Sequence, residues 1–281
     1  MLKKILTSTL IVANLSTFAQ LKTPKASPLS TITQQVGVSE IKISYSRPSV
    51  NQRDVFGDVV PYNQLWRTGA NSCSTIDITT DFTILNTKIT AGKYSILSRP
   101  SNNQWIIYLY QDTDFSGVPK EFDEKKVVGE FRVPVTKLNQ KQETFLISIE
   151  NITTKSFNLN LSWENQLVTL PIQLPTHEIV MENIKKTMQS GNVSANEYYA
   201  AADYYFENNV DLNQALIWIK KSTELHGKNL FWVMRKQALI EEKLGKKKDA
   251  VKSATIGLEE AKNSNNEQYT KYFEEIIKNN K

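Results

Sequence analysis

The chain has 281 residues, more than most single domains, and its 40% hydrophobic content supplies enough apolar side chains for two folded cores. Its net charge of +5 comes from 34 basic and 29 acidic residues spread along the chain. The one dense basic run, at residues 246–248, is followed at once by Asp249. A nucleic-acid-binding protein would show a basic stripe interleaved with stacking aromatic residues, so we expect no nucleic-acid partner.

The first residues have the pattern of an export signal. Two lysines precede an uncharged, mostly apolar stretch over residues 5–18, which ends in the small-residue pattern Thr17-Phe18-Ala19. This pattern predicts a signal peptide over residues 1–19 and a linker over residues 20–29. The stretch is too short for a hydrocarbon core that needs about 20 apolar residues. We therefore expect no transmembrane segment in the mature chain and a periplasmic or secreted location.

From residue 30 to residue 174, apolar residues recur at every second position. Ile41, Ile43 and Tyr45 alternate with polar residues, and residues 157–163 repeat the pattern. A turn signal at Glu164 and Asn165 separates these from a last expected strand over residues 167–174. This spacing, with many β-branched and aromatic residues, is typical of half-buried strands. Because no helical stretch separates the roughly nine strands, a parallel sheet is not expected. The sequence predicts an antiparallel β-sandwich of jelly-roll type over residues 30–174.

After residue 174 the apolar spacing changes to the period of an α-helix. Six helical stretches over residues 175–281 are separated by turns rich in Gly and Asn, which predicts three antiparallel hairpins. Ser194 and Glu197 have the spacing of a capping box at the start of one helix. One segment recurs about 35 residues later, and in each copy an alanine, Ala215 or Ala250, opens the second helix. This repeat resembles a tetratricopeptide array, in which Ala202 and Ala238 would mark the helix crossings. The chain is thus expected to be a two-domain α+β protein.

A long connection over residues 45–71, YSRPSVNQRDVFGDVVPYNQLWRTGAN, fits neither period. Connections longer than about 15 residues are uncommon in compact domains and usually have a function or several anchors. Arginine side chains can grip a carboxylate or phosphate through two parallel hydrogen bonds, and aromatic rings can stack on a sugar. The candidate ligand-binding residues of this connection are Arg47, Arg53, Tyr62, Trp66, Arg67 and Asn71.

The same residues also fit a purely structural role. Arginines that bond to buried carbonyl groups, or that lie beside Asp54 and Asp58, would lock the connection onto the sandwich. Trp66 would then fill the end of the core. Two interpretations stay open from the sequence: a pocket for a small anionic or sugar-like ligand, or an anchored loop.

Four motifs carry a resemblance to a known family: SPLST from residue 27, YSRPSV from residue 45, VFGDVVPYNQLWRTGAN from residue 55 and AGKYSIL from residue 91. With the helical tail, they make the chain resemble the bacterial family called domain of unknown function 2911. The chain departs from the usual Lys-Gly-Arg at residues 51–53, from Glu-Ala-Thr at residues 72–74, and from the usual loop at residues 112–126. The resemblance implies a secreted β-rich domain, typical of Bacteroidetes-like bacteria, with no agreed activity.

Catalytic constellations are absent from the expected β-sandwich. The only histidines, His177 and His226, lie in the helical half, so Ser-His-Asp and Cys-His arrangements are excluded from the sandwich. Cys73 has no neighbouring base and is interpreted as a core residue. No cluster has the spacing of a metal site, so no metal and no cofactor are predicted. Glu121 and Asp123 could serve a hydrolase, although acidic residues in a polar loop are usually only solvated.

Aromatic residues in the helical half exceed what one packing seam requires. Tyr199, Trp218 and Trp232 are the candidate partner-binding residues of a concave groove, although packing between helix pairs could use the same side chains. As a whole, the sequence predicts an exported, non-catalytic envelope binding or scaffold module with a helical protein-interaction tail. The alternatives are a binding protein for a small anionic or sugar-like ligand, and a hydrolase acting on envelope polymers.

Overall fold

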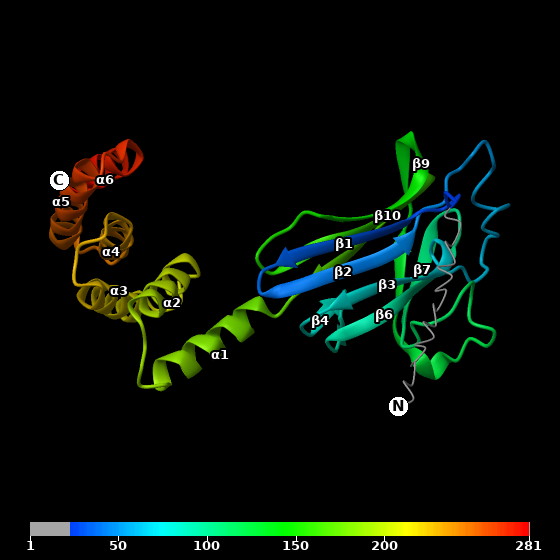
Figure 1. The fold of residues 1–281 in the computed structure, drawn as a ribbon, viewed down its shortest axis with the longest axis horizontal. Helices are drawn as coiled ribbons and strands as arrows, with labels where there is room; N and C mark the ends of the chain where they lie inside the picture. The colour runs from blue at the N-terminus through cyan, green and yellow to red at the C-terminus, as the bar shows by residue number, and fades with distance from the viewer. Residues whose placement is uncertain (1–22, 281) are drawn as a thin grey trace, which may run out of the picture. The chain divides into compact units, whose positions relative to one another are not determined.

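The structure, a computed structural model, describes residues 23–280. The predicted signal peptide over residues 1–19 lies outside the described residues, as does the start of the predicted linker. Contacts divide the chain into two compact units, one ending at Thr176 and one beginning at His177. The first unit is built from antiparallel strands and the second from helices (Figure 1), which confirms the predicted two-domain α+β class.

The β-unit contains two sheets. The larger has the strand order β1 (Leu29–Val36), β2 (Ser39–Ser46), β3 (Ala70–Ile78), β6 (Gly92–Pro100), β7 (Gln104–Tyr110) and β8 (Val127–Pro134). The smaller has the order β5 (Thr87–Ile89), β4 (Phe82–Ile84), β10 (Ser156–Gln173) and β9 (Thr136–Glu150). All of these pairings are antiparallel. The order corrects the jelly-roll prediction, because successive strands of the larger sheet are neighbours except where β4 and β5 leave for the smaller one.

Alternate side chains of both sheets form one hydrophobic core. In β2, Ile41, Ile43 and Tyr45 are buried, whereas Lys42 between them is exposed. The same core cluster includes Phe145 of β9 and residues of β10, so the two sheets pack face to face. The observed arrangement is therefore the antiparallel sandwich that the period-two spacing predicts.

The expected turn at Glu164 and Asn165 lies inside β10 instead. The pairing of β10 with β9 changes register on each side of Glu164, whose φ is +53°. An extra residue of this kind forms a β-bulge, which bends a strand without ending it. The two strands expected over residues 157–163 and 167–174 are consequently one long strand.

The helical unit has six helices: α1 (Thr176–Gln189), α2 (Ala195–Glu207), α3 (Leu212–His226), α4 (Phe231–Lys243), α5 (Lys247–Asn263) and α6 (Glu267–Asn280). α2 packs against α3, α4 packs against α5, and α6 packs mainly against α5. α1 pairs with no helix to a comparable extent. Two helix pairs and a closing helix thus replace the three hairpins that were expected. No described helix is long and apolar enough to cross a membrane.

Small side chains lie inside the helix pairs. Ala202, Ala215, Ala238 and Ala250, the four alanines of the expected repeat, are all fully buried. α2 begins with the predicted capping box, in which Ser194 Oγ accepts from the Glu197 amide and Glu197 Oε2 accepts from the Ser194 amide at 2.8 Å. Hydrogen bonds from the Ser194 side chain and backbone hold the pKa of Glu197 below its usual value.

Candidate functional site

The connection between β2 and β3, residues 47–69, is anchored to the sandwich by its backbone. The Val50 amide donates to the Glu143 carbonyl of β9 at 2.8 Å. Trp66 and Ser98 of β6 exchange two backbone hydrogen bonds, of 2.7 and 2.9 Å, as neighbouring strands do. The connection therefore obtains its order from β6 and β9, because it has no continuous strand or helix of its own.

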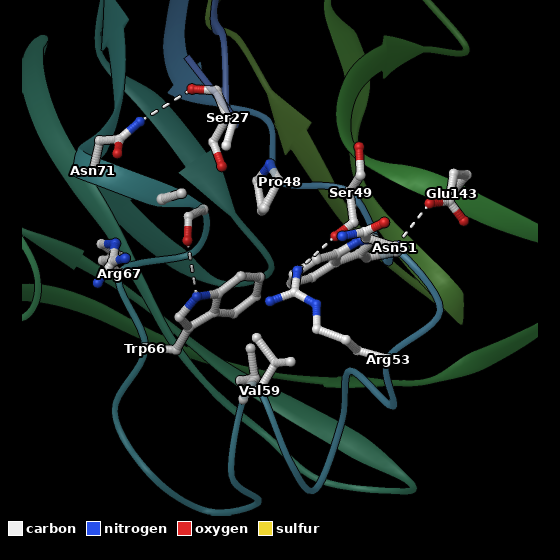
Figure 2. Close-up of a pocket in the computed structure, with 15 residues that line it drawn as sticks. Ser27, Pro48, Ser49, Asn51, Arg53, Val59, Trp66, Arg67, Asn71 and Glu143 are labelled. Carbon is white, nitrogen blue, oxygen red and sulfur yellow. Dashed lines mark hydrogen bonds between the residues drawn. The ribbon is translucent and has the colours of Figure 1, made fainter.

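This connection forms part of the wall of a pocket with a volume of about 800 Å³ (Figure 2). Ligand sites in proteins commonly have volumes of about 300–1,000 Å³. Four of the six candidate ligand-binding residues line the pocket, namely Arg53, Trp66, Arg67 and Asn71. The other two, Arg47 and Tyr62, are not part of its lining.

The residues that stay outside the pocket hold the connection in place. Arg47 Nε donates to the Phe145 carbonyl of β9 at 3.0 Å. The half-buried ring of Tyr62 covers Gly57, which has a φ of +107° and would bring an added Cβ to 3.1 Å from that ring. Tyr45, at the start of the same sequence stretch, is buried and donates its hydroxyl to the Ile147 carbonyl at 3.1 Å. The sequence cannot distinguish these anchors from pocket residues.

Arg53 has both an anchoring role and a position in the pocket. Its Nε donates to the Val50 carbonyl at 3.1 Å, and its Nη2 donates to the Ser49 carbonyl at 2.8 Å (Figure 2). Within residues 23–280, none of the three candidate arginines forms an ion pair, including with Asp54 or Asp58. The connection is therefore held through carbonyl groups, and the arginine charges have no carboxylate partner in this part of the chain.

Trp66 belongs mainly to the core. It is 8% exposed, and its ring lies parallel to that of Trp163 at 5.8 Å and edge-on to those of Trp105 and Phe145. Its Nε1 donates to the Gly69 carbonyl at 3.0 Å. These contacts cover the indole faces on which a sugar was expected to stack, so Trp66 offers the pocket an edge rather than a face.

Two buried donors of the pocket lining have no hydrogen-bond partner among the described residues. One is Arg67 Nε and the other is the indole Nε1 of Trp163, a side chain only 1% exposed. Buried N–H groups in folded proteins are nearly always bonded, and leaving one unpaired costs about 1–3 kcal/mol. Because neither atom is accessible to solvent in the open pocket, both are unsatisfied groups inside the wall and do not face the cavity.

Asn71 closes another side of the pocket. Its φ is +59°, and its Nδ2 donates to the Ser27 carbonyl at 3.0 Å and to Ser46 Oγ at 3.2 Å. Figure 2 shows the bond to Ser27, which ties the segment before β1 to the start of β3. The amide donors of Asn71 thus position the wall, since both bonds are to the chain itself.

Among residues 23–280, the one carboxylate in the lining comes from β9. Glu143 Oε1 accepts from the backbone amide of Asn51 at 2.9 Å, and its side chain is exposed (Figure 2). Asn51 and Gln52 have φ values of +49° and +59°. Glycine would adopt this left-handed conformation without steric cost. Here the turn that meets Glu143 is made with larger side chains.

Sequence reasoning missed Glu143 and Trp163 as pocket residues. Glu143 lies 92 positions from its partner Asn51, and the alternating pattern indicated only that Trp163 faces a core. The one available signal was an acidic residue, Glu143, in a stretch rich in Gln and Lys. Their positions along the chain do not show that Glu143 and Trp163 lie beside the connection between β2 and β3.

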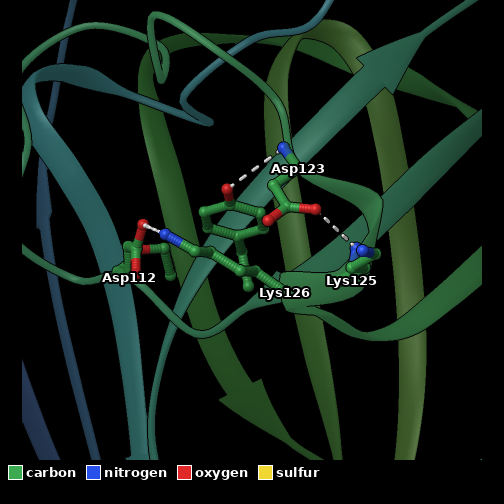
Figure 3. A network of polar contacts seen from close by, with 6 residues as sticks. Asp112, Asp123, Lys125 and Lys126 are labelled. Carbon is green, nitrogen blue, oxygen red and sulfur yellow. Dashed lines mark hydrogen bonds and ion pairs between the residues drawn. The ribbon is translucent and has the colours of Figure 1, made fainter.

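A separate polar network fixes the loop between β7 and β8. Lys126 Nζ pairs with Asp112 Oδ2 at 2.7 Å, and this hydrogen bond raises the pKa of Lys126 (Figure 3). Asp123 Oδ1 accepts from the Lys125 amide at 3.0 Å, while the Asp123 amide donates to the Tyr110 hydroxyl at 3.3 Å. The carboxylate of Asp123 thus caps a turn of 3₁₀ helix.

Other candidates for chemistry lie away from the pocket. Glu121 is exposed, and neither it nor Asp123 lines the pocket. Cys73 is buried, and its thiol donates to the Thr113 carbonyl at 3.3 Å. The position of Cys73 matches that of the core residue expected from the sequence.

The three partner-binding candidates of the helical unit differ in exposure. Tyr199 and Trp218 are half-buried against the α2–α3 cluster, and burial raises the pKa of Tyr199. The Trp218 ring packs against Tyr205 with centroids 4.7 Å apart. Trp232 is 39% exposed and packs edge-on to Phe231. Trp232 is therefore the candidate with the largest available surface.

Comparison with known proteins finds one family. The family described as "Protein of unknown function (DUF2911)" matches residues 27–172, just over half of the chain. This segment contains nearly the whole β-unit and almost all of the pocket lining. No curated protein and no solved structure matches the chain.

Proposed function

The chain belongs to the family of proteins of unknown function DUF2911, and we propose that it is an exported, non-catalytic binding module of the cell envelope. In this proposal the β-unit holds a small anionic or sugar-like ligand in the pocket beside Arg67. The observation that carries it is Arg67, whose positive side chain lies in the lining of a pocket of about 800 Å³ and forms no ion pair within residues 23–280. The proposed location, periplasmic or secreted, follows from the export-signal pattern of residues 1–19.

The charge of the lining supports a ligand with negative character. Arg53 and Arg67 contribute two positive charges and Glu143 contributes one negative charge, so the charged side chains sum to +1. A ligand oxygen would give the Arg67 guanidinium a charge-assisted hydrogen bond, which is stronger than one between neutral groups. The pocket would therefore favour acceptor-rich ligands over apolar ones.

A ligand screen by thermal unfolding tests this function. The chain without residues 1–19 would be heated with sugars, sugar phosphates, organic acids and peptidoglycan fragments. A ligand at 100 times its dissociation constant stabilises the protein by about 2.7 kcal/mol, which raises the midpoint by a few degrees. We expect such a shift for at least one compound and its loss in Arg67→Gln.

The matched control is Arg132→Gln. Arg132 is exposed on β8, pairs with Glu130 at 2.7 Å and lies outside the pocket lining, so its replacement should preserve the shift. A shift that persists in Arg67→Gln would place the ligand elsewhere, and a panel without any shift would contradict the binding function.

A second candidate function is partner binding by a tetratricopeptide-like helical unit. The 39% exposure of Trp232 favours it, as do the buried alanines of the two helix pairs. Trp232→Ala should then abolish co-purification of a specific envelope protein, whereas Ile217→Ala, at a residue that is 61% exposed, should not. Equal retention by both variants would contradict a role for Trp232.

A further inference from the structure

We infer that the pocket beside Arg67 takes an acidic saccharide, with the sugar carboxylate at Arg67 and the sugar hydroxyls toward Glu143. The inference rests on the proposed function, since it requires that this pocket binds a ligand. It goes further by naming the class of ligand. The class follows from a lining that is basic on one side of the pocket and acidic on the other.

The basic side of the pocket suits a single carboxylate. Arg67 lines the pocket with a partly exposed side chain and forms no ion pair within residues 23–280. Guanidinium groups bind carboxylates through two parallel hydrogen bonds. Arg53 adds a second positive charge, although carbonyl groups already hold two of its nitrogens. A neutral sugar would leave the Arg67 charge without a counterion.

The other side of the pocket is acidic. Figure 2 shows Glu143 on the opposite side from Arg67, with Trp66, Pro48 and Arg53 between them. Glu143 Oε1 accepts from the Asn51 amide, which leaves further acceptor capacity on the carboxylate. Hydroxyl groups can donate to it, whereas a second negative group of a ligand would be repelled. This side therefore favours neutral hydroxyl donors.

The walls between these sides are partly apolar. Pro48, Val59 and the edge of Trp66 line the pocket between the charged groups. The C–H groups of a sugar ring can cover such surfaces, whereas a bare inorganic anion gains nothing from them. The volume of about 800 Å³ also exceeds what a small inorganic anion fills. Carboxylate, ring and hydroxyls together match the three parts of the lining.

Isothermal titration of the full chain without residues 1–19 tests the inference. The acidic probes are D-glucuronate, D-galacturonate and N-acetylmuramate. D-Glucuronamide is the control that keeps the sugar but removes the charge, and cyclohexanecarboxylate keeps the charge and the ring but lacks hydroxyls. At least one acidic sugar should bind about tenfold or more tightly than both controls, because each control loses one set of charge-assisted hydrogen bonds.

Glu143→Gln separates sugar recognition from general attraction of anions. Glutamine keeps an oxygen that can accept from the Asn51 amide, so the turn should fold as before. If Glu143 accepts sugar hydroxyls, the variant should bind the acidic sugar about tenfold more weakly. If the pocket only attracts negative charge, removing this carboxylate should strengthen binding, and that result would overturn the inference.

The remaining outcomes distinguish the two proposals. If D-glucuronamide or cyclohexanecarboxylate bound as tightly as every acidic sugar, this result would overturn the acidic-sugar class. Failure of all three acidic sugars, with an Arg67-dependent thermal shift from a sugar phosphate or another compound of the wider screen, would overturn it while the binding function stands. Failure of every compound would remove both proposals.

Discussion

Two buried charged side chains of the helical unit have ion-pair and hydrogen-bond partners, whereas two buried donors of the β-unit pocket have none among the described residues. Lys236 of α4 is 6% exposed, and its Nζ lies 2.6 Å from both Asp203 Oδ1 and Glu207 Oε1. Its ammonium group also lies 4.5 Å from the centroid of the Phe206 ring. The two carboxylates and the aromatic ring together offset the cost of burying the Lys236 charge.

Glu241, also in α4, is similarly compensated. It is 1% exposed, and its carboxylate accepts from Ser253 Oγ at 2.7 Å and from Gln237 Nε2 at 3.1 Å, with Lys220 Nζ at 3.7 Å. In the pocket, by contrast, Arg67 Nε and Trp163 Nε1 have no partner among the described residues. Arg235 Nε of α4 is unpaired as well, so the contrast concerns individual groups and not whole units: Lys236 and Glu241 contribute hydrogen bonds to the fold, whereas Arg67 Nε and Trp163 Nε1 contribute none.

The largest expected effect is the loss of Glu241. Glu241→Ala should lower the free energy of unfolding by about 3 kcal/mol, because removing one partner of a buried network leaves the other groups unsatisfied. Urea denaturation measures the loss, and hydrogen exchange of α4 and α5 locates it. Glu259→Ala, at an exposed position of α5, should change stability by less than about 0.5 kcal/mol. Equal effects of both variants would break the comparison.

A smaller, pH-dependent effect is expected at Lys236. Burial lowers the pKa of its ammonium, but hydrogen bonds to Asp203 and Glu207 outweigh burial and raise it above the usual 10.5. A pKa that is higher in the folded state gives a stabilising contribution that is complete below the unfolded value. This contribution is lost as pH rises from about 10.5 through the folded pKa.

Lys236→Met should therefore lose about 1–2 kcal/mol at pH 7, since the hydrogen bonds to two carboxylates disappear. It should also flatten the fall in stability above pH 10.5, which midpoints of thermal unfolding at several pH values measure. Lys252→Met, at an exposed position of α5, should retain the alkaline loss. An unchanged alkaline profile in Lys236→Met would show that another group causes it.

The smallest expected effect is on the stability of Arg67→Gln. Arg67 Nε has no hydrogen-bond partner to lose. The free energy of unfolding of the variant without ligand should therefore stay within about 0.5 kcal/mol of the parent value. Chemical denaturation of both proteins checks this. A loss of several kcal/mol would identify Arg67 as an anchor of the connection. Arg67 would then contribute to stability as the buried charges of α4 do.

The regular elements could be predicted because each has a local signal. Alternating apolar residues identified strands such as β2, and the 3.6-residue period identified six helices, including the capping box at Ser194. The strand order was not predicted correctly, since alternation shows which side chains face a core but not which strands become neighbours. The bulge at Glu164 was mistaken for a turn because both use a residue with positive φ.

The pocket could be predicted only in part. Residues 45–71 were recognised by their arginine and aromatic content, and four of the six residues named there line the pocket. The division between pocket residues and anchors depends on contacts with distant strands. Arg47 bonds to Phe145, 98 positions away, and no local pattern separates this arginine from Arg67.

The long-range contacts of the connection have a consequence for the order of folding. The Tyr45 hydroxyl reaches a carbonyl 102 positions later in the chain, and the pocket draws its lining from Ala26 through Trp163. Contacts between residues so far apart form slowly, because a large loop must close before they stabilise anything. The pocket is therefore completed only when β9 and β10 have joined the sandwich, so a ligand of the proposed kind would bind only to a β-unit that has finished folding.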